Sequence, residues 1–390
     1  MRDAVIVDAV RTPVGKGKPG GALSGVHPVD LSAHVLKALA ERNRLDPGTV
    51  DDVIWGCVSQ VGEQSRSIGR YVVLAAGWPE HVPGLTIDRQ CGSSQQAVHQ
   101  AAAGVIAGQY DIAIAGGVES MSRVPMGSPR ADGKYGEPYG PLVNERYGNY
   151  RFNQGVGAEM LAEEFELIRE QLDQHALDSH ARAARAIDEG RFKEQITPIT
   201  VTAPDGSSRT FDTDEGVRRG GSLEVLANLA TPFKEDGVIS AGNSSQISDG
   251  SAALLVTTSE IAARNGWNPI ARFHTGVVTG VDPITMLKGP IPATRKALER
   301  AGLGLDDIGV FEVNEAFASV SLGWQRQIGA DYERLNPNGG AIALGHPLGG
   351  SGARLMTTLV HHMKDNGIRY GLQSMCEGGG MANATILELL

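Results

Sequence analysis

The chain has 390 residues, of which 41% are hydrophobic and 21% are charged, and its formal net charge is −10 at pH 7. This length predicts about two or three structural units with a large core, and the negative charge without a long basic run argues against a nucleic-acid-binding surface. No apolar run approaches the roughly 20 residues that cross a bilayer. The three cysteines are widely spaced and fit neither a disulfide framework nor a zinc site. We therefore expect a cytoplasmic protein with no metal, no membrane contact and no nucleic-acid partner.

Strand and helix patterns alternate through the first 120 residues. Strands are expected at 4–7, 53–58 and 111–115, and helices at 29–44 and directly after Cys91. In the helix after Cys91 the apolar positions 98, 101, 102, 105 and 106 form one buried face, and Gly108 is a suitable C-terminal stop. Cys91 is therefore predicted to lie in a turn of small residues at the entrance to a helix.

The character of the sequence changes between about residues 121 and 245. Residues 123–155 are rich in Gly, Pro, Tyr and Arg and are too long for a simple connection. We expect them to form an excursion that covers a site or a partner subunit. Residues 161–190 are predicted to form one charged helix, and a strand is expected at 252–256.

The last third of the chain repeats the layout of the first. Strands are expected at 270–278, 307–313 and 370–375, and helices at 292–301 and from residue 352 onwards. The order strand, helix, strand, loop, helix, strand thus occurs twice, which suggests two similar halves. Strands that alternate with helices predict mostly parallel sheets covered on both faces.

Cys91 is the candidate nucleophile. The unpaired N–H groups and the partial positive charge at a helix N-terminus stabilise a thiolate, so we expect a lowered pKa for this thiol. Gly92 would let a substrate carbonyl approach the backbone. The alternative is a buried structural cysteine, which is the commoner fate of a lone Cys and is our interpretation of Cys57.

His346 and Cys376 are the candidate proton carriers. His346 lies in a glycine-rich loop with few side chains to bury it, and an imidazole can act as a base toward Cys91. Cys376 opens another glycine loop, where a second thiol suits proton transfer to carbon. Backbone N–H groups at Cys91 and at Gly378 to Gly380 can form an oxyanion hole. Three other histidines are interpreted as solvated, namely His99, His361 and His362.

Five motifs, in this order along the whole chain, resemble those of the thiolase family. They are Asp88-Arg89-Gln90-Cys91-Gly92-Ser93, Gly116-Gly117-Val118-Glu119-Ser120-Met121-Ser122, Asn314-Glu315-Ala316-Phe317, Gly345-His346-Pro347 and Cys376-Glu377-Gly378-Gly379-Gly380. The resemblance implies an α/β fold of two similar βαβαβαββ halves in a five-layered α/β/α/β/α core. The halves would be residues 1–120 with 246–269, and 270–390, and residues 121–245 would form an inserted loop domain. Dimers or tetramers are also implied.

The resemblance further implies a mechanism and a set of roles. Cys91 would attack a 3-ketoacyl-CoA after losing its proton to His346, Cys376 would protonate the departing acetyl-CoA enolate, and CoA would then take the acyl group. Asn314 with His346, and the amides of Cys91 and Gly378, would stabilise the two oxyanions. Coenzyme A, a substrate rather than a bound cofactor, would contact the loop domain and its surroundings at Arg218, Ser245, Phe233, Ala316, Phe317 and Met286. A solvated basic pair is the alternative for Arg218 and Arg219.

Two departures from the family pattern bear on the substrate. Asn153-Gln154-Gly155 stands where short-chain acetoacetyl-CoA thiolases usually have His-Met-Gly, and Ser94-Gln95-Gln96 stands where Gly-Leu-Gln is common. Both look similar to actinobacterial thiolases of steroid breakdown, so we expect an acyl group longer or bulkier than acetyl. The alternatives are a short-chain acetoacetyl-CoA thiolase, a decarboxylating ketoacyl synthase, a Cys–His acyl hydrolase, and a non-catalytic acyl-CoA or sterol carrier.

Overall fold

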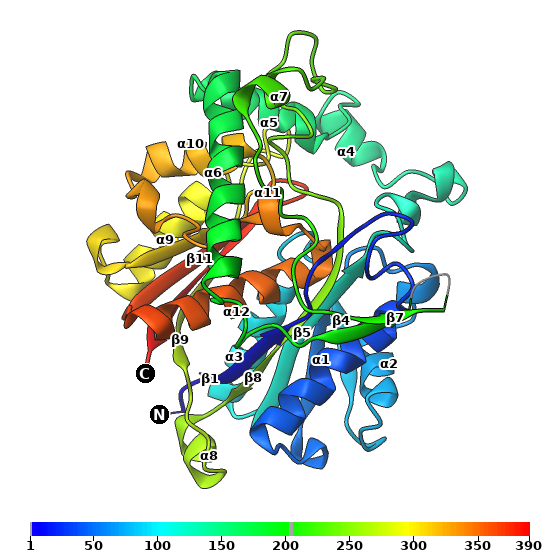
Figure 1. Ribbon diagram of the computed structural model, residues 1–390, viewed down its shortest axis with the longest axis vertical. Helices are drawn as coiled ribbons and strands as arrows, with labels where there is room; N and C mark the ends of the chain where they lie inside the picture. The colour runs from blue at the N-terminus through cyan, green and yellow to red at the C-terminus, as the bar shows by residue number, and fades with distance from the viewer. Residues whose placement is uncertain (1, 203–205) are drawn as a thin grey trace.

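The computed structural model describes residues 2–202 and 206–390, so residues 203–205 of the expected inserted segment lie outside the described part (Figure 1). The strands are β1 (Val5–Arg11), β2 (Gly15–Lys16), β3 (Asp52–Gly56), β4 (Gly84–Ile87), β5 (Ile112–Ser120), β6 (Ile199–Thr202), β7 (Ser208–Phe211), β8 (Ser248–Thr257), β9 (Ala271–Gly280), β10 (Val310–Val313), β11 (Tyr370–Glu377) and β12 (Met381–Leu389). The helices are α1 (Pro28–Asn43), α2 (Ile68–Ala75), α3 (Ser93–Ala107), α4 (Pro141–Arg146), α5 (Gln154–Glu164), α6 (Arg169–Asp188), α7 (Leu223–Ala227), α8 (Ser259–Arg264), α9 (Pro290–Ala301), α10 (Ala318–Ile328), α11 (Ala341–Leu344) and α12 (Leu348–Asn366). Within these residues, no helix is long and apolar enough to cross a membrane.

The main sheet contains the same arrangement of strands twice. Its order is β10-β11-β12-β9-β1-β8-β5-β3-β4, with β2 paired to β8. In one half the pairs β1-β8 and β8-β5 are antiparallel, and the pair β5-β3 is parallel. The other half has the same sequence of pairings: β9-β12 and β12-β11 are antiparallel, and β11-β10 is parallel. The halves join where β1 pairs with β9. The expectation of two similar halves therefore agrees with the topology, while the exact domain bounds stay a prediction.

The expectation of mostly parallel sheets is wrong, because the sheet is mixed. Tight connections explain the difference. β11 turns directly into β12 through Gly379 and Gly380, which both have positive φ, and such a hairpin makes the two strands antiparallel. The sequence pattern did not predict β12 as a strand.

Helices cover both faces of the sheet and also fill the space between its two halves. In Figure 1, α1 and α2 lie at the lower right and α9 and α10 at the left, with α12 between them. α3 and α12 pack against each other and supply most of the helical part of a core that includes Val98, Val105, Met356 and Leu359. The layers are thus α/β/α/β/α, as the family resemblance implied, and the N-terminal ends of α3 and α12 meet at the centre of the molecule.

The inserted segment is more regular than its composition indicates. α5 begins at Gln154, capped by the Asn153 side chain, which accepts hydrogen bonds from the N–H groups of Gly155 and Val156. The single helix predicted over 161–190 is two helices, because the chain breaks between Glu164 and Arg169, where Glu166 has a φ of 51°. α3, in contrast, ends as predicted, with Gly108 in the left-handed conformation.

Candidate active site

Cys91 lies in a tight turn between β4 and α3. The N–H of Ser93 donates to the carbonyl of Gln90, and the Ser93 hydroxyl accepts from the N–H of Arg89 at 2.9 Å. Gln90 adopts a φ of 49°, so the turn is held in a left-handed conformation one residue before the cysteine. This brings Cys91 to the N-terminus of α3 as predicted, with its side chain almost completely buried.

The expected lowering of the Cys91 pKa is wrong in direction. Burial, with the neighbouring Glu377 carboxyl as a further cause, raises the pKa of Cys91 to about 12, although the backbone N–H acts the other way. Desolvation disfavours a thiolate more strongly here than the helix terminus favours it. The resting thiol is therefore protonated, and it needs a base before it can attack a substrate.

Cys376 lies beside Cys91 because of its position near the end of β11. It is the penultimate residue of β11 and is fully buried, and its pKa is raised by burial and also by its electrostatic interaction with Cys91. The next residue, Glu377, packs so closely on Gly92 that a Cβ atom placed on the glycine would lie 2.0 Å from Glu377 Oε1. From β12, the Asn383 side chain donates to the Gly92 carbonyl at 3.1 Å. The β11–β12 hairpin thus fixes the second thiol against the turn that carries the first.

His346 is fixed in the orientation and tautomer that a base requires. Its backbone N–H donates to the carbonyl of Gln246 and to the Ser248 hydroxyl, and its Nδ1 lies 2.6 Å from Ser351 Oγ. The Ser351 hydroxyl hydrogen is already donated to the Pro347 carbonyl, so Ser351 accepts from Nδ1–H. Nε2 is then the nitrogen with a free lone pair, and it is buried without a hydrogen-bond partner among the described residues.

Burial, with the Arg354 guanidinium as a further cause, lowers the pKa of His346 to about 3. The imidazole is therefore neutral at physiological pH, and its free lone pair can accept a proton.

Close backbone contact brings the loop of His346 toward the turn of Cys91. The N–H of Ala353 in α12 donates to Ser94 Oγ in α3 at 2.8 Å. Two glycines make this approach possible: a Cβ atom on Gly352 would lie 2.2 Å from the backbone N of Gln95, and one on Gly349 would lie 2.6 Å from Cys57 Cα. The first turn of α3, after the candidate nucleophile, therefore packs against the second turn of α12, after the candidate base.

Asn314 lies at the same end of the sheet. β10 runs parallel to β11, so its last residues pair with those before Cys376, and the Asn314 N–H donates to the Ser374 carbonyl at 3.1 Å. Both polar atoms of the Asn314 side chain are buried without a partner within the described part of the chain. A buried amide with this free capacity is suited to hold a water or a substrate oxygen.

Glu119 joins three pieces of the site through one buried carboxylate. Its Oε2 accepts from the N–H groups of Val58 and Gly349 at 3.0 and 2.9 Å, and its Oε1 accepts from Ser59 N–H and the Gln64 amide at 3.0 and 2.8 Å. Since Gly349 lies in the first turn of α12, directly after the His346 loop, this carboxylate positions that loop on the first half of the sheet.

Replacing Glu119 by Gln is expected to lower the free energy of unfolding by about 2–4 kcal/mol, because an amide NH₂ would then face two buried donors. Urea denaturation measures this loss. Glu260→Gln is the matched control, since Glu260 is paired with Arg264 on an exposed helix and should change stability by less than about 0.5 kcal/mol. Equal effects of the two substitutions would contradict the bridging role of the Glu119 carboxylate.

Glu377 adds a pH-dependent charge next to Cys91. Burial raises the pKa of Glu377 to about 8, while Arg89 acts in the opposite direction. Below pH 8 the carboxyl is mostly neutral, and above it the carboxylate opposes a thiolate on Cys91. We expect alkylation of Cys91 by iodoacetamide to rise less steeply with pH above about pH 8 in the wild type, and to keep its slope in Glu377→Gln. Mass spectrometry of the Cys91 peptide measures the alkylation rate at each pH. If the rate depends on pH in the same way in wild type and in Glu377→Gln, this carboxylate does not act on the thiol.

Five of the six residues predicted to contact CoA are connected by contacts among themselves. The Ser245 N–H donates to the Ala316 carbonyl, and the rings of Phe233 and Phe317 lie edge to face with centroids 6.1 Å apart. Met286 belongs to the same hydrophobic cluster as Ala316 and Phe317. Arg218 is exposed, and its backbone N–H donates to His180 Nδ1 at 3.0 Å.

Arg219, its neighbour, forms an ion pair with Asp188 in which both side chains are more than half exposed. The interpretation of a solvated basic pair therefore fits Arg219, and Arg218 keeps a free guanidinium within the described residues.

The three histidines interpreted as solvated are not. His361 is buried and its Nε2 lies 3.0 Å from the Ala9 carbonyl, and His99 Nε2 lies 2.7 Å from Thr385 Oγ1.

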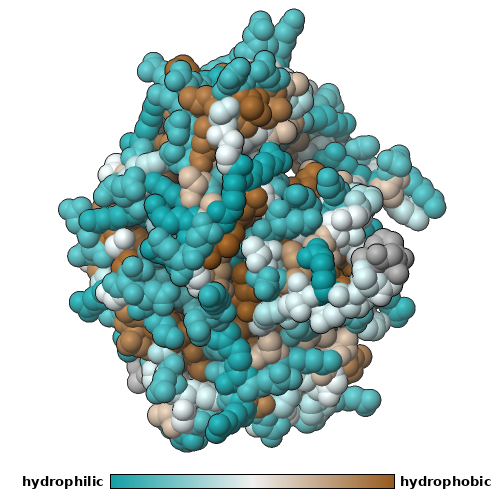
Figure 2. Space-filling model, in the orientation of Figure 1, coloured by the Kyte–Doolittle hydropathy of each residue, from teal (hydrophilic) through white to brown (hydrophobic). Residues whose placement is uncertain are grey.

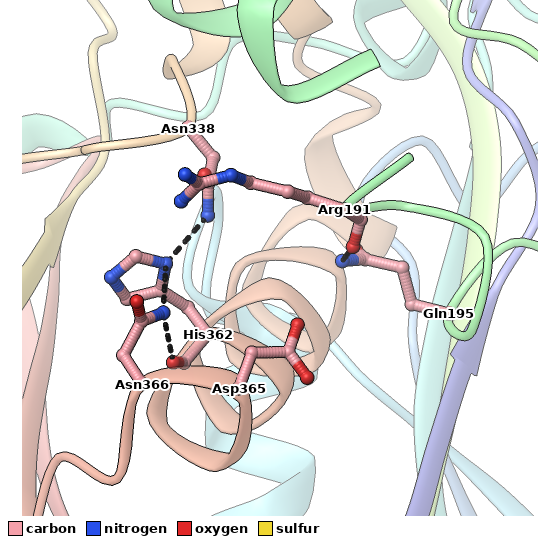
Figure 3. A pocket seen from close by; sticks show the side chains of 6 residues that line it. All are labelled: Arg191, Gln195, Asn338, His362, Asp365 and Asn366. Carbon is pink, nitrogen blue, oxygen red and sulfur yellow. Dashed lines mark hydrogen bonds between the residues drawn. The ribbon is translucent and has the colours of Figure 1, made fainter. Parts of the chain in front are cut away.

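His362 lies in the wall of a polar cavity of about 190 Å³, lined by Arg191, Gln195, Asn338, His362, Asp365 and Asn366. Figure 3 shows Asn338 and Asn366 on either side of the His362 ring, both within hydrogen-bond distance of Nδ1. None of the predicted site residues lines this cavity.

Sequence reasoning missed the groups that support the site. Ser351, Ser248 and Asn383 orient His346 and the Cys91 turn, but each is an isolated polar residue within a helix or strand. The position of Glu377 could have been used for prediction. It directly follows Cys376, and a carboxyl next to a candidate thiol affects the pKa of that thiol.

Comparisons with known proteins agree with this arrangement. The family model described as thiolase, N-terminal domain matches residues 4–260, and that of the thiolase, C-terminal domain matches residues 267–389. The chain is 48% identical to the steroid 3-ketoacyl-CoA thiolase FadA6 of Mycobacterium tuberculosis, over 100% of this chain and 95% of that protein. It is 44% identical to a beta-ketoadipyl-CoA thiolase of Escherichia coli, over the full length of both. The crystal structure of the Bacillus anthracis acetyl-CoA acetyltransferase has a TM-score of 0.91 at 38% identity and covers 100% of this chain and 99% of that one. The chain therefore belongs to the thiolase family.

Proposed function

We propose that this thiolase cleaves 3-ketoacyl-CoA with CoA to give acetyl-CoA and a shortened acyl-CoA, through an acyl group carried on Cys91. The observation that supports this most strongly is the pairing of two buried thiols, one at the start of α3 and one near the end of β11. His346, a neutral imidazole whose Nε2 has no partner among the described residues, lies in the loop before α12, the helix that packs on α3. A Cys–His acyl hydrolase has no use for the second thiol. A decarboxylating ketoacyl synthase needs a second histidine, where this chain has Asn314 and Cys376.

The proposed reaction has two stages. In the first, His346 Nε2 takes the proton of Cys91, whose sulfur attacks the 3-keto carbon. The C2–C3 bond then breaks, its electron pair goes to the acetyl-CoA enolate, and the Cys376 thiol protonates C2. In the second, a CoA thiol gives its proton to Cys376 and its sulfur displaces Cys91 from the acyl group. The Cys91 thiolate then takes back its proton from His346, which restores the starting state. The reverse sequence is a Claisen condensation.

Two sets of donors would stabilise the negative oxygens. Asn314, through a water, together with His346 would stabilise the enolate oxygen, and the amides of Cys91 and Gly378 would stabilise the tetrahedral oxyanion. The Asn314 side chain, which is buried and has no partner among the described residues, supports the first assignment. Loss of one such donor typically lowers the rate by ~10²–10³.

Coenzyme A would enter along the inserted segment as a substrate. The cluster of Ser245, Ala316, Phe317, Phe233 and Met286 would line its pantetheine, and Arg218 would meet its nucleotide end.

We propose a cytoplasmic homo-oligomer, a dimer or a tetramer. The inserted segment supports an oligomer, because Met126, Tyr135 and Leu142 are between 63% and 81% exposed. Figure 2 shows a further group of hydrophobic side chains near the top of the molecule over α7, where Val225 is 63% exposed. Three free cysteines fit a reducing compartment.

The substrate is proposed to carry an acyl group longer or bulkier than acetyl. The names of the relatives support this, since they act on steroid-derived and ketoadipyl thioesters. The test is thiolysis of acetoacetyl-CoA against longer and ring-bearing 3-ketoacyl-CoAs. We expect a higher kcat/KM for the larger substrates, and a clear preference for acetoacetyl-CoA would favour the short-chain alternative.

A further inference from the structure

Two glutamine side chains converge on the glycine loop after Cys376. A Cβ atom placed on Gly378 would lie 2.9 Å from Gln90 Oε1 and 3.2 Å from Gln154 Nε2. Gln90 comes from the turn before Cys91, and Gln154 is the first residue of α5 in the inserted segment. Three parts of the chain that are far apart in sequence thus meet at one point beside the two thiols.

The position of Gln154 also links this point to the predicted CoA cluster. Its neighbour Gly155 lies under the Phe233 ring, since a Cβ atom on that glycine would come within 2.2 Å of the ring. Phe233 in turn packs edge to face on Phe317. Gln154 therefore stands between the surface proposed for pantetheine and the catalytic loop.

Both amides have hydrogen-bonding capacity that the protein does not use. Among the residues the structure describes, the Gln154 side chain forms no hydrogen bond, and Gln90 offers only its Nε2 to Asp88 at 3.4 Å. Both side chains are partly buried. An alkyl chain that covers them would leave these amides unpaired, which is unfavourable, whereas an oxygen on the ligand would accept from Gln154 Nε2.

We propose, on the basis of the function proposed above, that the Gln154 amide recognises a carbonyl or carboxylate oxygen carried by the acyl group, remote from the 3-keto carbon, by donating from Nε2. The acyl fragment is the part of the substrate concerned, because it stays on Cys91, the residue next to Gln90, while CoA leaves. Gln154 sets specificity, and the enzyme prefers 3-ketoacyl-CoAs with a polar acyl group over alkyl ones of equal length.

The test compares kcat/KM for three 3-ketoacyl-CoAs of equal chain length, whose acyl groups end in a methyl group, end in a carboxylate, or carry a second ketone. Wild-type enzyme is expected to prefer at least one polar substrate by tenfold or more.

Gln154→Met keeps the side-chain size and removes the hydrogen bonds, so it should lower kcat/KM for that substrate by about 10–100-fold and leave the methyl-ended one unchanged or improved. Gln154→Glu should penalise the carboxylate substrate more than the ketone, which distinguishes the two sources of oxygen. Gln327→Met, on the exposed side of α10, is the matched control and should change neither.

The outcomes separate this inference from the proposed function. If wild-type enzyme cleaves the methyl-ended substrate at least as well as both polar ones, or if Gln154→Met lowers all three equally, the inference is overturned while thiolysis stands. If wild-type enzyme cleaves none of the three, the proposed function itself fails. Thermal unfolding of each variant shows that a loss of rate is not a loss of fold.

Discussion

Replacing Cys91 by Ala is expected to lower the rate of acetyl-CoA release by roughly 10⁴-fold or more, because the acyl group then has no sulfur to bind. The substitution removes one buried sulfur at the edge of the core, so the protein should still fold. Release of acetyl-CoA from 3-ketoacyl-CoA and CoA measures the rate, and circular dichroism checks the fold. Unchanged thiolysis would favour the non-catalytic carrier instead.

Cys57 provides the matched control for this substitution. It is also a fully buried free cysteine, and it belongs to the hydrophobic core between α1, α2 and the first half of the sheet. Cys57→Ala should cost about 1 kcal/mol of stability and leave thiolysis within about twofold of wild type. If both cysteine variants lose activity to the same extent, the loss reports damage to the core and not the absence of a nucleophile.

Replacing Cys376 by Ala is expected to separate the two stages of the reaction. Cleavage of the carbon–carbon bond should slow by about 10²–10⁴-fold, the typical contribution of a general acid or base. Exchange of an acyl group between acyl-CoA and free CoA transfers no proton to carbon, and His346 can pass the Cys91 proton to and from the CoA sulfur without Cys376. Exchange should therefore fall by much less, within about tenfold. The two rates are measured on the same protein, with 3-ketoacyl-CoA for cleavage and with labelled CoA and acetyl-CoA for exchange.

An equal loss of both rates in Cys376→Ala would contradict a proton-transfer role. It would mean that the second thiol acts mainly by supporting the Cys91 turn, against which it packs. Thiolysis that is unaffected by the substitution would assign the proton transfer to another group.

Local patterns in the sequence were sufficient to predict the placement of the site residues. The helix after Cys91, its end at Gly108, and the glycine-rich loops of His346 and Cys376 all depend on short-range rules of helix periodicity and glycine conformation. The repeated layout of the two halves was readable for the same reason. Features that depend only on neighbouring residues were therefore predictable, while the identity of the reacting groups stays a prediction.

The energetics of the site depend on contacts that the sequence does not show. A thiol at a helix N-terminus predicts a lowered pKa, but Cys91 is buried and Glu377 from β11 packs over Gly92, so its pKa rises instead. His361 lies on the polar side of its helix as judged from the sequence, and only the packing of α12 between the two halves explains why it is buried. The mixed sheet likewise depends on β12, whose pairing with β9 joins segments about 100 residues apart.

The most direct test of acyl transfer through Cys91 is to find which residue carries the acyl group. Cys376→Ala protein, which should accept an acyl group but not protonate carbon, is incubated with acetyl-CoA, quenched in acid and digested for peptide mass spectrometry. We expect an added acetyl mass on the peptide that contains Cys91 and none on the peptide that contains Cys57. An acetyl group on another residue, or no adduct while acyl exchange continues, would contradict a covalent role for Cys91.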